Sequence, residues 1–276
     1  MPYQLKQIPS ETEIKRIIKK IVFGRGGKYC LKCGSKRVVE EERRYWCCQC
    51  RSRFSLLSQT WLKDMKLNLE EFWLVLWCYV GKVPLLQAVA LTELPEKTII
   101  HWYDKFREQL LRFVEQQAHL TLEGNIQMDE AYFGHFDKSR CLLMAKQTTG
   151  KTRLVFELLP PGISPSRTHV IEFIRTYIAP GSNLNTDGSP LYQYIDRYWP
   201  LTHQVNIHDK FEFDLTSQIE GTFGNLRMFI RRMYYHPSSD KLGAIITEFT
   251  LRFNHPEVFK NPRCFLEFIL HPATLG

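Results

Sequence analysis

The spacing of apolar residues differs between the two halves of the chain. Over residues 10–23, apolar side chains recur every three or four positions, and Ser10 and Glu13 are placed as a capping box, which predicts a short amphipathic helix. The same spacing predicts three further helices, at 69–80, 84–91 and 95–113. Beyond residue 124 the spacing changes to that of strands. We therefore expect a helical first half and an α/β second half.

The second half predicts an ordered series of strands and helices. Strands are expected at 125–133, 139–147, 152–159, 182–186 and 204–208, and helices at 167–177, at 189–198 and from about residue 215. Three strands, helix, strand, helix, strand, helix is the order of an RNase H-like α/β domain, in which helices flank a mixed sheet. We expect this fold for the second half.

Four of the eight cysteines form two C-x-x-C pairs, Cys30 with Cys33 and Cys47 with Cys50. Each pair can supply two thiolates to one tetrahedral ion, and short strands around Val38 and Tyr45 complete the outline of a zinc ribbon. So small a module has too little apolar area to fold without its metal. We expect a structural zinc here, and the alternative is four ordinary reduced cysteines.

Positive charge is concentrated at the N-terminus. Residues 1–53 hold 14 Lys and Arg against 5 Asp and Glu, a balance of 14 − 5 = +9, whereas the whole chain carries +8. A cationic module of this kind favours a polyanionic partner, because Lys and Arg release counterions from phosphate backbones.

The helices predicted at 84–91 and 95–113 resemble a helix-turn-helix, with the TELPEK turn between them. The early residues of the second of these helices would then lie in a major groove. The side chains expected to face DNA are Lys97, Thr98, His101 and Lys105. The alternative is a three-helix bundle with a core of Trp73, Trp77 and Trp102.

Two carboxylates, Asp129 and Glu130, lie in the middle of the strand predicted at 125–133, where acidic residues are disfavoured. Successive side chains point to opposite faces of a strand, so only one of the two can join a given site, and we expect it to be Asp129. A carboxylate on a buried sheet face needs a positive partner, and a divalent cation is a suitable one.

Two further acids follow in order, Asp187 at the end of a predicted strand and Glu220 one turn into a predicted helix. Taken singly, each is more typical of a turn or a solvated helix face. An ordered Asp, Asp and Glu set nevertheless suits two Mg²⁺ or Mn²⁺ ions that promote in-line phosphoryl transfer. We expect the three acids to meet in space.

The helix that carries Glu220 also carries basic residues. Arg227 lies two turns beyond Glu220 and hence on the same face, where it could contact a phosphate. Arg231 and Arg232 extend this basic surface.

These motifs stand in an order that resembles a known family. The segments are CLKCG, WCCQC, MDEAYFG, NTDGSPLY, NIHDKF, LTSQIEGTFGNLR and ITEFTLRFN. They resemble the bacterial insertion-sequence transposases of the ISXO group, related to eukaryotic Merlin elements, from about Tyr29 to Asn254. The chain departs from the family pattern at Phe133-Gly134-His135 and at Leu215-Thr216-Ser217, which bears on loop geometry and leaves the acids in place.

The resemblance implies a DDE transposase that binds the terminal inverted repeats of its element, cleaves DNA with metal ions and joins the ends to a target. Asp129, Asp187 and Glu220 would bind the ions, and His208 would have an auxiliary role. Double-stranded DNA, as transposon ends and target, and a second copy of the chain in a homodimer are the implied partners.

The expected domains are an N-terminal helix (1–28), a zinc ribbon (29–55), a helical DNA-binding domain (60–118), an RNase H-like DDE catalytic domain (120–255) and a C-terminal extension (256–276). Two other functions remain open: a domesticated DNA-binding protein that does not cleave, and a zinc-ribbon RNase H-like nuclease that does not join strands. No apolar run reaches about eighteen residues and the N-terminus lacks the apolar middle of a secretory signal. We therefore expect a cytoplasmic, nucleoid-associated protein without a membrane segment.

Overall fold

The chain forms two compact units. The structure, a computed structural model, describes residues 8–42, 44–58, 60–116, 120–134, 139–206, 216–235 and 237–270. Unit 1 comprises residues 1–109 and 257–276, and unit 2 comprises residues 110–256. Helix α4 (Glu96–Gln116) runs from one unit into the other. Within the described ranges, no helix combines the length and apolar character that crossing a bilayer requires.

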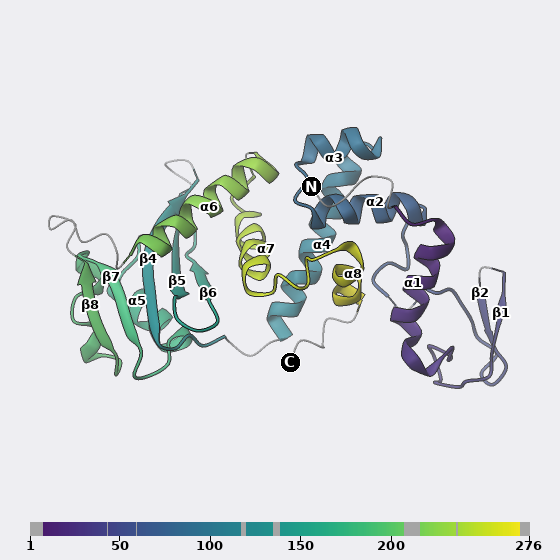
Figure 1. Cartoon of the computed structure of the whole chain (residues 1–276), viewed down its shortest axis with the longest axis horizontal. Coiled ribbons are helices and arrows are strands. Elements are labelled where there is room, and N and C mark those ends of the chain that lie inside the picture. The colour runs from purple at the N-terminus through teal and green to yellow at the C-terminus, as the bar shows by residue number, and fades with distance from the viewer. Residues whose placement is uncertain are drawn as a thin grey trace. The chain divides into compact units, whose positions relative to one another are not determined.

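The first part of unit 1 is a helix followed by three short strands (Figure 1). The capping box of Ser10 and Glu13 starts the helix, as predicted, because Glu13 accepts the backbone N–H of Ser10 at 2.9 Å. The elements are α1 (Glu11–Phe23), the 3-10 turn η2 (Gly24–Gly26), β1 (Val38–Glu41), β2 (Arg44–Cys47) and β3 (Arg53–Phe54). The strands pair antiparallel in the order β1-β2-β3. The third has only two residues and was too short for the pattern to predict.

Helix α1 packs directly on this small sheet. Lys19 and Lys28 both form ion pairs with Glu40 of β1. The ring of Phe23 at the end of α1 meets the ring of Tyr45 on β2 edge to face, with centroids 5.2 Å apart. Such aromatic pairs contribute about 0.5–1.5 kcal/mol beyond area burial. The helix and the strands therefore form one packed module.

The rest of unit 1 is helical. Its helices are α2 (Leu69–Val80), α3 (Leu85–Thr92), the first part of α4, and α8 (Pro262–Leu270). Asn68 caps α2 by accepting the N–H of Glu71 at 2.8 Å. Only residues 93–95 join α3 to α4, and Glu93 ends α3 in the left-handed region at φ 56°. The order and the short turn are those of the predicted helix-turn-helix-like region.

Aromatic rings form the centre of this helical part. The Tyr79 ring of α2 lies 5.1 Å from that of Phe106 in α4, and Phe265 of α8 lies 5.3 Å from Tyr79 and 5.8 Å from Phe106. We expected residues 256–276 to form a C-terminal extension. In the structure, its helix instead completes the core of unit 1, because Phe265 is fully buried between these two rings.

Unit 2 contains a five-stranded mixed sheet. The strands are β4 (Asn125–Phe133), β5 (Arg140–Gln147), β6 (Arg153–Leu158), β7 (Asn183–Asp187) and β8 (Thr202–Asn206). Their order is β6-β5-β4-β7-β8, with β5 antiparallel to β4 and β6, and with β7 and β8 parallel to β4 and to each other. This is the sheet of an RNase H-like domain, so the predicted fold is confirmed. Strand β4, which carries Asp129, is central.

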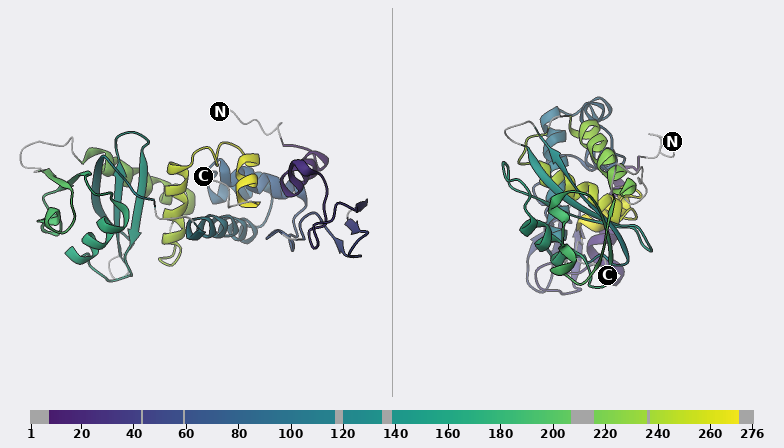
Figure 2. Two further views of the ribbon diagram at one scale, coloured as in Figure 1. Left: turned by 90° about the horizontal axis from the view of Figure 1, so that it is seen from below. Right: turned by 90° about the vertical axis from the view of Figure 1, so that its left-hand side faces the viewer.

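Helices cover both faces of this sheet (Figures 1 and 2). Helix α5 (Arg167–Tyr177) packs on one face and α6 (Ser217–Tyr234) with α7 (Leu242–Asn254) on the other. Strand β4 divides its side chains between them, since Ile126 and Met128 join the core under α5, whereas Ala131 and Phe133 join the core under α6 and α7. The period-2 pattern of β4 thus builds two separate cores.

The segment after β7 differs from the prediction. A helix was expected at 189–198, but the structure has two 3-10 turns, η4 (Pro190–Tyr192) and η5 (Ile195–Arg197). Tyr194 separates them because it adopts φ 62°, which a right-handed helix does not accommodate. The strand expected at 204–208 already begins at Thr202 and is followed to Asn206.

Candidate active site and metal centre

The pairing of β4 with β7 brings two of the predicted acids to the same level of the sheet. The strands run parallel with Asn125 opposite Asn183 and Gln127 opposite Asn185. Continued by two residues, this register sets Asp129 beside Asp187, and neighbouring strands lie about 4.8 Å apart. Both carboxylates are half-buried.

The third acid comes from α6. Glu220 lies in the first turn of this helix, which packs on β4 and β5, and its carboxylate is exposed. The hydroxyl of Thr216, the N-cap residue, donates to Oε1 of Glu220 at 2.9 Å and so orients the carboxylate. Asp187 is oriented in a similar way, since its Oδ1 accepts the backbone N–H of Ser189 at 3.1 Å.

The electrostatics show that the charges of the other two acids act on Asp129. The pKa of Asp129 is raised to about 7, chiefly by burial. The hydrogen bond that Asp129 accepts from the N–H of Glu130 opposes this rise, and the charges of Glu130, Asp187 and Glu220 add to it. A half-buried carboxylate surrounded by like charges is a setting that a divalent cation relieves. The charges of Asp187 and Glu220 thus act on Asp129, while a shared cation site and the catalytic role of the three acids stay predictions.

Glu130 lies on the opposite face of β4, as its place in the strand requires. Its carboxylate accepts a hydrogen bond from the hydroxyl of Tyr192, a fully buried residue of the core under α5. Burial raises the pKa of Glu130, the bond from Tyr192 opposes this, and the charge of Asp187 adds to it. Glu130 therefore ties the turn that follows Asp187 to the central strand.

The basic residues of α6 lie where the helical period predicted them. Arg227, Arg231 and Arg232 are all exposed. The guanidinium carbon of Arg227 stands 5.4 Å from the ring centroid of Phe133, a cation–π contact. Because Phe133 is on the same face of β4 as Asp129, this contact holds Arg227 along the face that carries the acids.

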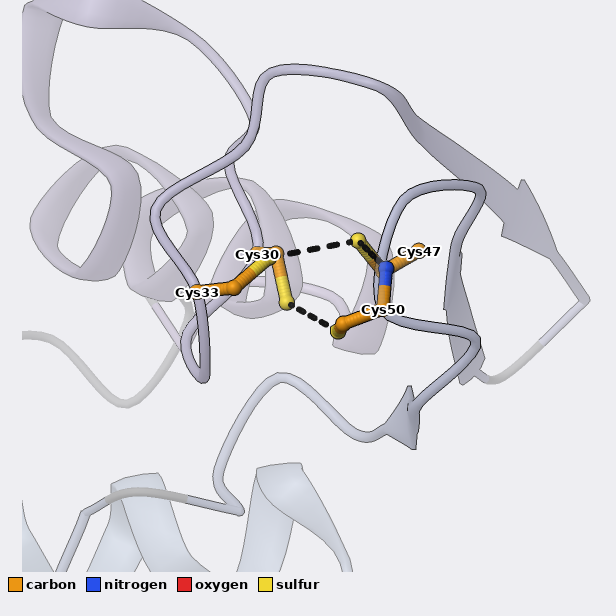
Figure 3. Close-up of side chains that lie close together, drawn as sticks. All are labelled: Cys30, Cys33, Cys47 and Cys50. Atoms are coloured by element: carbon orange, nitrogen blue, oxygen red, sulfur yellow. Dashed lines mark hydrogen bonds between the residues drawn. The ribbon is translucent and has the colours of Figure 1, made fainter.

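The four predicted cysteines converge in unit 1 (Figure 3). The Sγ atoms of Cys30 and Cys50 lie 3.6 Å apart, as do those of Cys33 and Cys47, and all four Sγ atoms lie within 4.8 Å of one another. Four sulfurs at about 2.3 Å from a tetrahedral ion would be separated by about 3.8 Å. The spacing fits a closed four-sulfur metal site, and neighbouring Cys48 is exposed and outside it.

Backbone hydrogen bonds give the two knuckles the same shape. In the first, the N–H of Gly34 donates to the carbonyl of Cys30 at 2.8 Å; in the second, the N–H of Arg51 donates to the carbonyl of Cys47 at 2.9 Å. The hydroxyl of Ser52 lies 2.9 Å from Sγ of Cys50, and this hydrogen bond lowers the pKa of the Cys50 thiol. A thiol that ionises more easily is a better metal ligand.

The residues expected to face DNA lie on the first turns of α4. Lys97 and His101 are exposed, whereas Thr98 and Lys105 are half-buried, and Lys105 forms an ion pair with Glu108 at 2.9 Å. Trp73 and Trp102 are buried and Trp77 is half-buried, as the three-helix-bundle reading also required. His208 lies outside the described residues.

Residues 121–254 match the family model of the ISXO2-like transposase domain. Because of this similarity, we call residues 121–254 the ISXO2-like domain. It contains the three acids and the basic residues of α6, and the cysteine centre and the helices of unit 1 lie outside the matched range.

Solved retroviral structures also resemble the ISXO2-like domain. The simian T-cell lymphotropic virus intasome in complex with PP2A regulatory subunit B56 gamma shares 16% identity at a TM-score of 0.35, and the match covers 50% of this chain and 51% of that one, about half its length. The dimeric form of the HTLV-2 integrase catalytic core domain in complex with magnesium shares 13% identity at a TM-score of 0.32. This match covers 49% of this chain and 87% of that one. The trimeric form shares 14% identity at a TM-score of 0.31, and the match covers 49% of this chain and 86% of that one. Comparison with curated proteins gives no match.

Two side chains of the ISXO2-like domain that the sequence did not single out contact the elements carrying the acids. Tyr192 bonds Glu130, as described, and Gln127 accepts hydrogen bonds from the start of α6. A polar residue in an otherwise apolar stretch of a central strand, as Gln127 is, was the signal that could have drawn attention to it.

Proposed function

We propose that the protein is a DNA transposase that binds the terminal inverted repeats of its element, cleaves DNA there and joins the ends to a target. The observation that supports this best is that Asp129 lies level with Asp187 on the adjacent strand and is acted on by the charges of Asp187 and Glu220, within the ISXO2-like domain. Binding alone would not need three acids near a phosphate backbone, which they repel.

The three acids would bind the metal ions, and Arg227 would bind the DNA backbone. Asp129 and Asp187, fixed on adjacent strands, and Glu220, oriented by Thr216, would hold two Mg²⁺ or Mn²⁺ ions. When bound, such ions lower the pKa of an attacking hydroxyl and neutralise charge on the phosphate. Arg227, held against Phe133, would bind a neighbouring phosphate and keep the strand in line.

Two reactions of the same type follow on this site. A water oxygen attacks the phosphorus at the element end, the bond to the 3′ oxygen breaks, and a free 3′-hydroxyl and a 5′-phosphate result. The 3′-hydroxyl then attacks a phosphorus of the target, and the displaced target oxygen leaves as a hydroxyl. Each step forms one phosphorus–oxygen bond and breaks one.

Unit 1 would recognise DNA. The basic N-terminal module and the start of α4, with Lys97, Thr98, His101 and Lys105, would contact double-stranded transposon ends. Arg231 and Arg232 would extend the DNA contact on α6. The cysteine centre would hold one structural zinc ion. Two copies of the chain would bridge two ends as a homodimer, acting at the nucleoid in the cytoplasm, and His208 would assist the acids.

A strand-transfer assay tests the catalytic assignment. The full-length zinc-loaded protein is mixed with a labelled DNA end taken from the flank of its own element and with Mg²⁺ or Mn²⁺. Asp129→Asn, Asp187→Asn and Glu220→Gln should each lower the joining rate by about 10³-fold or more, because each removes a metal-binding oxygen. The matched control is Asp196→Asn, since Asp196 is an exposed acid of η5 a few residues beyond Asp187.

The products separate the rival functions. Joined DNA from the wild type, lost in the three variants and kept in the control, supports the transposase. Cleaved but unjoined DNA points to a nuclease, and bound but uncleaved DNA points to a domesticated DNA-binding protein. Joining by Asp129→Asn at the wild-type rate contradicts the assignment of that residue.

A further inference from the structure

We infer that Gln127 is a positioning residue that sets the place of Glu220 relative to Asp129. The inference rests on the proposed function. Gln127 lies on β4 two residues before Asp129, so the two side chains share one face of the sheet. It is only 4% exposed, which is unusual for a glutamine on a central strand.

The buried amide of Gln127 caps α6 from outside the helix. Its Oε1 accepts the backbone N–H groups of both Gln218 and Ile219, each at 3.0 Å. These N–H groups belong to the first turn, where helical acceptors are scarce. The N–H of Ile219 also donates to the carbonyl of Thr216 at 3.1 Å, whereas the N–H of Gln218 depends on Gln127. Strand β4 therefore supplies the acceptor that a helix start needs.

The N-cap residue of α6 has a different partner. Thr216 makes no side-chain cap hydrogen bond to the first turn, and its hydroxyl donates to Oε1 of Glu220. Capping and orientation are thus divided between two residues. Gln127 fixes the backbone of the first turn, and Thr216 fixes the carboxylate that this turn carries.

Lys146 holds the same turn from the neighbouring strand. It pairs with Gln127 across β4 and β5, and its Nζ donates to the carbonyl of Gln218 at 3.4 Å. Its ammonium also lies 5.7 Å from the ring centroid of Phe253 in α7. The peptide groups on both sides of Gln218 are therefore bonded to adjacent residues of the sheet.

Glu220 follows Gln218 by two residues and moves with this turn. Metal sites require ligands held to within about 0.5 Å, and loss of a residue that orients a ligand typically lowers metal affinity 10–100-fold. Without the Gln127 oxygen, the N–H of Gln218 loses its acceptor and the N–H of Ile219 keeps only the carbonyl of Thr216. The bonds from Gln127 that hold the first turn of α6 to β4 are then absent, and the turn is free to shift. Gln127 would thus act on the metal site through Glu220, without touching metal or DNA.

The test compares two buried glutamines of the same sheet. Gln127→Met keeps the length of the side chain and removes the acceptor, and Gln127→Glu keeps an acceptor oxygen. The matched control is Gln147→Met: Gln147 of β5 is 7% exposed, and its Oε1 accepts the N–H of Glu123 at 3.0 Å, near the ends of the strands away from the acids.

Mn²⁺ binding and amide exchange are measured on the zinc-loaded full-length protein, with thermal unfolding beside them. Gln127→Met should bind Mn²⁺ at least 10-fold more weakly than the wild type, and the amide hydrogen of Gln218 should exchange at least 10-fold faster. Gln127→Glu should restore the slow exchange. Gln147→Met should lower the unfolding temperature to a similar extent and leave Mn²⁺ affinity within about twofold of wild type.

Wild-type Mn²⁺ affinity in Gln127→Met, or an equal loss in Gln147→Met, would overturn the positioning role while leaving the proposed transposase intact. A wild-type protein that binds Mn²⁺ but joins no DNA would instead remove the proposed function, and the affinities would still decide the role of Gln127. A wild type that binds no Mn²⁺ would remove both.

Discussion

The cysteine centre and the carboxylate centre are built in opposite ways. The four cysteines lie within residues 30–50, and all their sulfurs gather within 4.8 Å. The three acids come from two strands and a helix far apart in the chain, and no group of carboxylates among the described residues gathers as closely as the sulfurs do. The cysteines form a closed shell of ligands, whereas the acids would form an open cluster.

The two centres also differ in what holds their ligands. Backbone bonds within each knuckle, such as Gly34 to Cys30 and Arg51 to Cys47, shape the cysteine centre locally. The carboxylates depend on tertiary contacts, and the charges of Asp187 and Glu220 help to raise the pKa of Asp129. A closed site suits a metal that stabilises a fold, and an open site leaves room for a substrate phosphate.

The largest effect is expected from opening the closed centre. Cys47→Ser removes one of four ligands, and because zinc binding contributes about 10–16 kcal/mol to the folding of such modules, the ribbon should lose its metal and unfold. Cys48→Ser changes the neighbouring, exposed cysteine and should retain one zinc per chain. Zinc content after dialysis against a chelator, with proteolysis of residues 29–55, measures both. Equal zinc retention in the two variants would contradict the four-cysteine site.

A smaller effect should come from the charge of the open centre. The pKa of Asp129 is raised from 3.8 to about 7, chiefly by burial, so this group stabilises the metal-free fold fully below about pH 4 and loses that contribution as pH rises through about 7. Between pH 5 and pH 8 the loss should be about 2–3 kcal/mol, at about 1.4 kcal/mol per unit. The Asp129→Asn variant cannot ionise at this position, so it should not show this loss of stability between pH 5 and pH 8.

Urea unfolding of magnesium-free protein at pH 5 and pH 8 measures this difference. Adding Mg²⁺ at pH 8 should restore stability to the wild type and not to Asp129→Asn, because a bound cation favours the ionised carboxylate. The same pH dependence of stability in both proteins would show that ionisation of Asp129 does not cause the loss of stability.

Substitutions of Arg227 test whether the DNA-binding surface extends from the acids along α6. Arg227→Ala should weaken DNA binding by about 1–2 kcal/mol and lower the salt dependence by about one phosphate contact. Arg227→Lys should recover only part of the affinity, because an ammonium lacks the planar contact with Phe133 and the paired donors of a guanidinium. Fluorescence anisotropy across salt concentrations distinguishes the three proteins. If Arg227→Ala binds DNA with the affinity and salt dependence of the wild type, Arg227 does not contact the DNA, and the proposed site does not extend beyond the acids.

The smallest effects concern the local shape of the knuckles. Equivalent positions hold Gly34 at φ 74° and Arg51 at φ 57°, a region that costs residues other than glycine about 1–2 kcal/mol. Gly34→Ala should therefore lower the stability of the ribbon by about 1 kcal/mol, and Arg51→Gly should raise it by a few tenths. Arg53→Gly, in the extended strand β3, should lower it. Thermal unfolding of the zinc-loaded protein checks all three, and a loss in Arg51→Gly would contradict the account.

Sequence patterns located the elements well where the cause was local. The capping box at Ser10, the alternation over β4 and the C-x-x-C spacing each depend on residues a few positions apart, and the structure has all of them. The helix expected at 189–198 was wrong because Tyr194 adopts a left-handed conformation that no short-range pattern announces. The place of α8 in the core of unit 1 was missed for a related reason, since its partners Tyr79 and Phe106 lie far back in the chain.

By itself, the sequence determined which acids could share a site, because the two-residue period of a strand puts Asp129 and Glu130 on opposite faces. It also determined the cysteine centre, whose ligands are brought together by two tight turns. Only the tertiary structure decided that β7 lies beside β4 with Asp187 level with Asp129, and that α6 begins on the side chain of Gln127. Strand order and helix docking depend on burial and hydrogen bonds between residues distant in sequence, and these exist only once the sheet has formed.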